Sequence, residues 1–200
     1  MKKLLLFFLA LVSINTGICQ KNFTLGVLAG VGKPELILGY ISSSSWQLGG
    51  LSLLRPVNLG IYGDYAITKQ IHAGTDVSYY RLILQESNKN GDPIIQDKFH
   101  YLNIAPYVAY EPIKWVSIAF NISLRPLLKF EQGNALYSTA ATLLSYYGPR
   151  LTLKPIKQIG IDIGYENGAR SFAVGHIGPD PTLLTNTVWY TNIRIAAFAK

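Results

Sequence analysis

Residues 116–124 read VSIAFNISL, and an apolar side chain alternates there with a small or polar one at every step. Side chains of a β-strand point alternately to opposite faces of the sheet, so the apolar set covers one face. Its members are Val116, Ile118, Phe120, Ile122 and Leu124. A strand with lipid on one side and a polar lumen on the other needs this pattern, repeated along the whole chain.

The same period of two recurs in six further segments and, less strictly, in an opening strand at 23–31. In the segment 57–67, Leu59 and Ile61 oppose Gly60 and Tyr62. The other segments are 71–83, 101–110, 139–153, 158–167 and 187–199. The sequence therefore predicts eight strands, an even number, as bacterial single-chain barrels have.

Short turns alternate with longer polar connections. The short turns are Thr68-Lys69, Pro112–Lys114 and Lys154–Lys157, and the longer loops are Gly32–Arg55, Glu86–Asp97, Glu131–Leu136 and Gly168–Asn186. Outer-membrane barrels have short periplasmic turns and longer extracellular loops. We expect an all-β protein, an eight-stranded antiparallel up-and-down transmembrane β-barrel in the outer membrane, with the short turns and both termini periplasmic.

A soluble eight-stranded barrel that binds a ligand has the same length but the opposite polarity, with an apolar interior. Here the apolar face is broad and carries ring residues near the strand ends. These are Tyr65, Tyr79, Tyr110, Trp115, Tyr147, Tyr165 and Trp189. The membrane barrel is favoured, and the soluble ligand-binding barrel remains an alternative.

The composition excludes several other classes. Of 200 residues, 49% are hydrophobic and 14% charged, which is incompatible with intrinsic disorder. The formal net charge of +7 comes from Lys and Arg scattered singly rather than in the basic clusters of a nucleic-acid-binding protein. Cys19 is the only cysteine, so cysteine supplies no disulfide and no metal site.

The first residues resemble a secretory signal peptide. Lys2 and Lys3 precede an apolar run from Leu4 to Val12, and small residues follow near Gly17. The run is shorter than a membrane-spanning helix requires. We expect residues 1–19 to be a cleaved signal peptide and residues 20–200 to form a single barrel domain.

Two stretches resemble the PorT-like outer-membrane β-barrel proteins of Bacteroidetes. The first has the pattern Gly-x-Tyr-x-x-Tyr at residues 60–65 and continues into the Thr68-Lys69 turn, and the second spans residues 101–107. The resemblance implies an eight-stranded outer-membrane barrel. Most members of that family have no assigned activity, and a few are linked to protein export or gliding machinery.

Strand phase places several charged residues on the lumen side. Arg150 and Asp162 fall nearly opposite each other on adjacent strands, and Arg194 lies beside Asp162. Asp64 and Asp76 flank the first short turn and could draw the same arginines across a narrow lumen. These five residues form a predicted lumen ionic cluster, in which Asp162 is flanked by two arginines and no continuous pore remains.

The sequence points to no catalytic, cofactor-binding or metal site. His72, His100 and His176 lie on separate segments without ligand spacing. His72 and Ser78 share a face but are about 20 Å apart along one strand, too far for a direct dyad. We therefore expect no enzyme and no cofactor.

The resulting hypothesis is a structural or interaction protein of the outer membrane, with a plugged lumen and exposed loops, a candidate component of a secretion or envelope assembly. Its partners would be outer-membrane lipid and other envelope proteins, not nucleic acid. A barrel that binds or modifies lipid is the alternative.

Overall fold

The computed structural model describes residues 22–39, 51–87, 93–131, 133, 137–140, 142–168, 173–177 and 180–198. The predicted signal peptide, residues 1–19, lies outside the described residues. No helix in the described part of the chain is long and apolar enough to cross a membrane.

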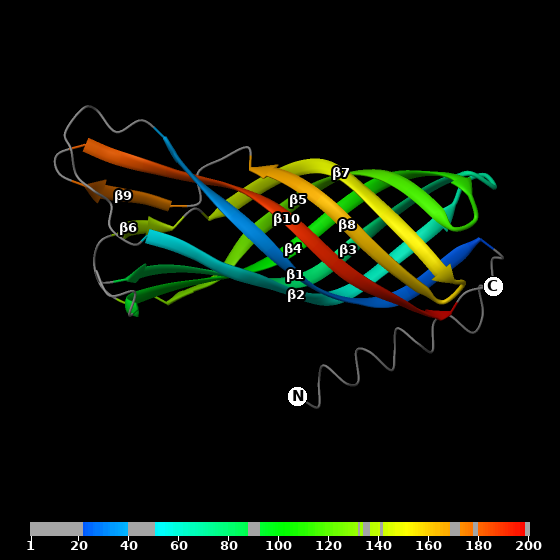
Figure 1. Ribbon diagram of the computed structural model, residues 1–200, viewed down its shortest axis with the longest axis horizontal. Helices are drawn as coiled ribbons and strands as arrows, with labels where there is room; N and C mark the ends of the chain where they lie inside the picture. Colours follow the sequence, from blue (N-terminus) through cyan, green and yellow to red (C-terminus); the bar gives the residue numbers. More distant parts are fainter. Residues whose placement is uncertain are drawn as a thin grey trace.

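Eight antiparallel strands close into a barrel, as the alternation predicted (Figure 1). Each pairs with the next, and β1 pairs with β10 to close the wall. The barrel strands are β1 (Phe23–Gly39), β2 (Leu51–Ala66), β3 (Ile71–Ser87), β4 (Pro93–Ile113), β5 (Val116–Glu131), β7 (Leu143–Ile156), β8 (Ile159–Gly168) and β10 (Asp180–Phe198).

Two short strands extend the wall at one end. β9 (Ala173–Ile177) pairs with the first part of β10, and β6 (Tyr137–Ala140) pairs with β9. They lie at the end of the barrel opposite to the short turns (Figure 1). We call these two ends the loop end and the turn end.

The strands run farther toward the loop end than the sequence predicted. β1 continues to Gly39 and β2 starts at Leu51, both inside the predicted loop Gly32–Arg55. The predicted strand 139–153 is interrupted before β7, and the loop Gly168–Asn186 contains β9 and the start of β10. The strands were predicted from the alternation of their side chains. Backbone pairing does not need that alternation, so the strands can continue where the pattern stops.

The two faces of the wall differ as predicted. Ile118 and Phe120 are each 53% exposed, whereas Ser117 and Ala119 between them are buried in the interior. The outward rings include Tyr65, Tyr79 and Trp189, whereas Trp115, in the turn between β4 and β5, lines a cavity at the end of the barrel with the short turns. An apolar exterior around a partly polar interior is the reverse of a soluble ligand-binding barrel.

Candidate functional site: a charged lumen

All five predicted residues lie on the inner face of the barrel. Asp64 is on β2, Asp76 on β3, Arg150 on β7, Asp162 on β8 and Arg194 on β10. All except Asp64 are at most 5% exposed, because successive residues on each strand alternate between lipid and lumen.

Four of the five form one ionic group, which we call the central network. Asp76 Oδ2 accepts from Arg150 Nη1 at 2.8 Å and from Arg194 Nη2 at 2.5 Å. Arg194 Nε also donates to Asp162 Oδ2 at 2.5 Å, and Thr152 Oγ1 donates to Asp162 Oδ1 at 2.8 Å. β3, β7, β8 and β10 are thereby tied together through the lumen.

The pairing inside the central network differs from the prediction. Asp76, not Asp162, accepts from both arginines, and Asp162 pairs with Arg194 alone. Cross-strand register places Arg150 opposite Gly164 and Asp162 opposite Thr152. The long side chain of Arg150 reaches across the narrow lumen to Asp76 on β3, and not to Asp162 on the adjacent strand.

Aromatic rings support the arginines. The Cζ atom of Arg150 lies 4.0 Å from the centre of the Tyr107 ring, and that of Arg194 lies 4.7 Å from the Tyr62 ring. A desolvated guanidinium over a ring face is stabilised by the ring quadrupole. The two guanidinium groups of the central network are therefore packed against ring faces.

Asp64 lies nearer the turn end and is linked to the central network through the Tyr107 hydroxyl, which accepts from Arg194 Nη1 at 3.5 Å. Its Oδ2 lies 2.9 Å from His72 Nδ1, and its Oδ1 accepts from the Tyr107 hydroxyl at 3.0 Å. His72 Nε2 lies 3.6 Å from Glu111 Oε2, which also accepts from Lys154. These side chains line a cavity of about 610 Å³, the turn-end cavity, whose inner wall includes Arg150 and Arg194.

A second buried ion pair was missed by the sequence reasoning. Arg125 on β5 donates through Nη2 to Glu166 on β8, and through Nε to Asn103 Oδ1 at 3.0 Å. Its guanidinium lies between two rings, 4.0 Å from the centre of Tyr80 and 4.1 Å from that of Tyr146. The alternation of residues 116–124 and 158–167, continued by one residue in the first case, puts both Arg125 and Glu166 on the lumen face, and this signal could have identified them.

The carboxylate of Glu166 has further donors. Its Oε1 accepts from Asn121 Nδ2 at 2.9 Å and from Ser123 Oγ at 2.6 Å. Tyr190 donates its hydroxyl to Asn121 Oδ1 at 3.3 Å. The buried charge is thus embedded in a connected polar layer, as buried charges require.

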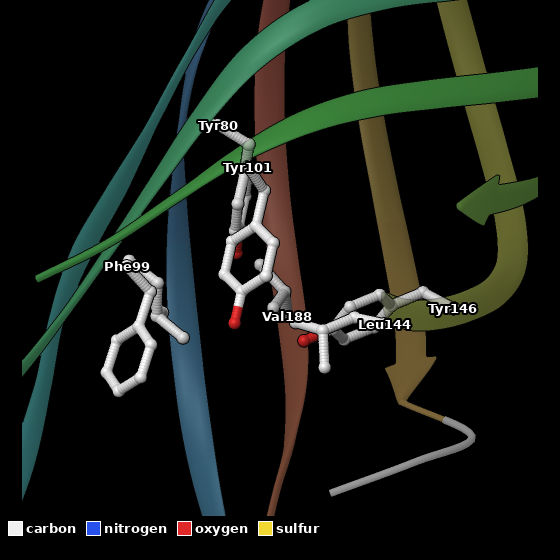
Figure 2. Close-up of a cluster of buried hydrophobic side chains, with 7 residues drawn as sticks. Tyr80, Phe99, Tyr101, Leu144, Tyr146 and Val188 are labelled. Atoms are coloured by element: carbon white, nitrogen blue, oxygen red, sulfur yellow. The ribbon is translucent and has the colours of Figure 1, made fainter. Parts of the chain in front are cut away.

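An apolar cluster fills the lumen on the loop-end side of that layer. Figure 2 shows the labelled side chains gathering between the strands; the cluster consists of Tyr80, Leu82, Phe99, Tyr101, Leu144, Tyr146 and Val188. Phe130 stacks on Phe99 with ring centres 4.9 Å apart. The interior is filled in turn by the central network, the Arg125 layer and the apolar cluster.

The arrangement is suited to occlusion rather than to bond chemistry. Both ring nitrogens of His72 are directed to carboxylates, and His100 contacts the Tyr79 hydroxyl through Nδ1. Ser78 accepts from Asn103 at 3.2 Å. In the described residues, no group of three or more His, Cys, Asp or Glu side chains is placed to hold a metal ion.

Solved structures share this fold. The outer membrane protein OprG from Pseudomonas aeruginosa aligns over 88% of this chain and 93% of its own, with a TM-score of 0.60 and 8% identity. Neisserial surface protein A aligns over 86% of this chain and 96% of its own, with a TM-score of 0.51 and 12% identity. No protein-family model matches the sequence, and neither does any curated protein. The likeness therefore establishes a fold of small outer-membrane barrels and no family within it.

Proposed function

We propose that the protein is a small outer-membrane barrel whose side-chain-filled lumen makes it a structural or interaction protein and not a diffusion pore. The observation that carries this proposal is the central network, in which one carboxylate, Asp76, binds arginines from two strands across the lumen. An eight-stranded barrel is just wide enough for side chains to fill.

The surface supports insertion into a lipid bilayer. The outward apolar side chains are continuous around the wall, with Leu59, Val108 and Ile118 all more than half exposed. Exposed apolar area of this extent marks contact with a partner or with lipid. By analogy with bacterial barrels, the turn end would be periplasmic, and with it the start of β1 and the end of β10.

The loop end supports the interaction role. Strands of about 9–11 residues span a bilayer. β4 has 21 residues and β10 has 19, so both extend well beyond the lipid. The proposed resemblance to the PorT-like family favours a partner in a secretion or envelope assembly. Among the described residues, no hydrolase-like arrangement supports lipid modification.

Planar-bilayer recording tests the absence of a pore. The purified barrel is reconstituted beside a larger porin as a positive control. We expect no steady porin-sized conductance from this protein. A stable conductance of that size would contradict the plugged lumen.

Site-specific photo-crosslinking tests the interaction role. A photoreactive residue replaces Gly133, which lies at the loop end of β5, and the same residue at lipid-facing Ile118 serves as the control. We expect a recurring envelope protein to be captured from position 133 and lipid from position 118. Capture of no protein from position 133 would contradict a partner at that position.

A further inference from the structure

Basic side chains gather on the outer surface of three adjacent strands. Arg81 on β3 is paired in register with His100 on β4, and His100 with Lys129 on β5. Lys98 on β4 lies in the next outward row, opposite Glu131. We call Arg81, Lys98, His100 and Lys129 the basic row.

The basic row faces away from the lumen. Its members alternate with buried residues such as Tyr80, Leu82 and Phe99, and the side chain of Lys129 is 66% exposed. It begins two residues beyond Tyr79, an outward ring that also touches His100. Outward rings of this kind mark the membrane interface in barrels, so the row lies at the level of lipid headgroups on the loop-end side.

The charges of the row are not balanced within the protein. Among the strand residues whose side chains the structure describes, Glu131 is the only acidic one facing outward, and it accepts from Lys129 at 2.6 Å. His100 Nε2 is 3.7 Å from the same carboxylate and has no hydrogen-bond partner. Arg81, Lys98 and Lys129 thus carry three positive charges against the single carboxylate of Glu131, so an external anion would stabilise the row.

We propose that the basic row binds the phosphate groups of a phosphorylated glycolipid, lipopolysaccharide, in the outer leaflet. This rests on the proposed function, because it requires the loop end to face the outside of the outer membrane. Arg81 offers a planar fork of donors, Lys98 and Lys129 offer point charges, and phosphate suits both. The exposed apolar band just below the row would contact the acyl chains of the same lipid.

The test measures retained lipid on barrels reconstituted with purified lipopolysaccharide, by native mass spectrometry. The variant is Arg81→Gln/Lys98→Gln. The matched control, Lys69→Gln/Lys114→Gln, removes two exposed lysines from hairpin turns at the turn end, away from the basic row. We expect the variant to bind about tenfold or more weakly and the control to bind like the wild type, since each interfacial cation adds to anionic-lipid affinity.

A second measurement needs no variant. The wild-type barrel is titrated with the same lipid after enzymatic removal of its phosphates, and we expect the weak binding of the Arg81→Gln/Lys98→Gln variant. Equal binding of both lipid forms would overturn the inference, as would equal loss in variant and control. Membrane fractionation distinguishes failure of this inference from failure of the proposed function. Extraction of the protein from membranes by urea would contradict the barrel's location. An inserted barrel whose lipid binding does not depend on phosphate would contradict only the role of the basic row.

Discussion

Asp76 on β3 and Arg194 on β10 are 118 positions apart in the sequence, yet Asp76 Oδ2 lies 2.5 Å from Arg194 Nη2. Two strands, β1 and β2, separate them along the wall, so the contact crosses the lumen. Arg150 on β7 reaches the same oxygen from the other direction. A single carboxylate therefore joins three parts of the wall that share no backbone pairing.

Asp76→Ala should destabilise the barrel more than Asp162→Ala. Removing Asp76 leaves two buried arginines short of a partner, and losing one member of a buried pair costs about 3–5 kcal/mol. Asp162→Ala leaves Arg194 still bound to Asp76. Urea midpoints of unfolding in lipid vesicles measure both. Equal midpoints for the two variants would show that Asp76 is not the centre of the network.

Arg125→Lys should destabilise the barrel by about 2–3 kcal/mol although the charge is kept, because hydrogen bonds to charged groups are worth that order of energy. A lysine cannot stack between Tyr80 and Tyr146 while donating to Glu166 and Asn103. The readout is the temperature at which heating changes the mobility of the folded barrel in a gel, and we expect it to be lower in the variant.

The double variant Arg125→Met/Glu166→Gln provides the control for that result. It removes the buried charge from both partners, so it should be less unstable than Glu166→Gln alone, which leaves Arg125 buried without its carboxylate. A strictly additive double variant would mean that the two side chains are energetically independent.

Phe120→Arg should reduce the free energy of unfolding by about 2–4 kcal/mol, which is the cost of a cation on the lipid face near the bilayer midplane. Leu128→Arg is the matched control, since Leu128 is 60% exposed on the same strand but adjoins Lys129 beyond the apolar band. Its cost should be about 0–1 kcal/mol. The two variants are compared by their folding yields in lipid vesicles. Equal yields would show that the apolar band is not centred near Phe120.

Gly164→Ala should destabilise the barrel by about 1–3 kcal/mol through overpacking. A Cβ there would lie 2.3 Å from Cζ of the Tyr190 ring, whose hydroxyl is held by Asn121. At Gly63 the nearest atom, on Phe23, is 3.4 Å away. Thermal melting should therefore distinguish Gly164→Ala from a nearly neutral Gly63→Ala.

Strand phase could be predicted from the sequence because the side-chain period of a strand is exact. A shift of one residue would turn every apolar side chain into the lumen. Ile118 and Phe120 lie outside and Ser117 and Ala119 inside, as the alternation indicated. The lengths of the strands could not be obtained in the same way, because the sequence does not alternate strictly near Gly39 or Leu51.

The partners of the lumen charges were only partly predictable. The interior positions of Asp76, Arg150, Asp162 and Arg194 follow from phase alone. Which arginine meets which carboxylate depends on how far the wall is sheared and how wide the lumen is, and neither quantity is written in a local pattern. Arg125 and Glu166 were overlooked for the same reason, since they are 41 positions apart.

The contribution of β10 to the central network bears on the order of assembly. Arg194 belongs to the last barrel strand in chain order, and until that strand docks, Asp162 has only Thr152 and Asp76 has only one arginine. An open seven-stranded intermediate would therefore carry uncompensated negative charge inside. The final strand brings the counter-charge with it, so sealing the wall and neutralising the interior become one event, and a barrel closed with the wrong strand would be left electrostatically incomplete.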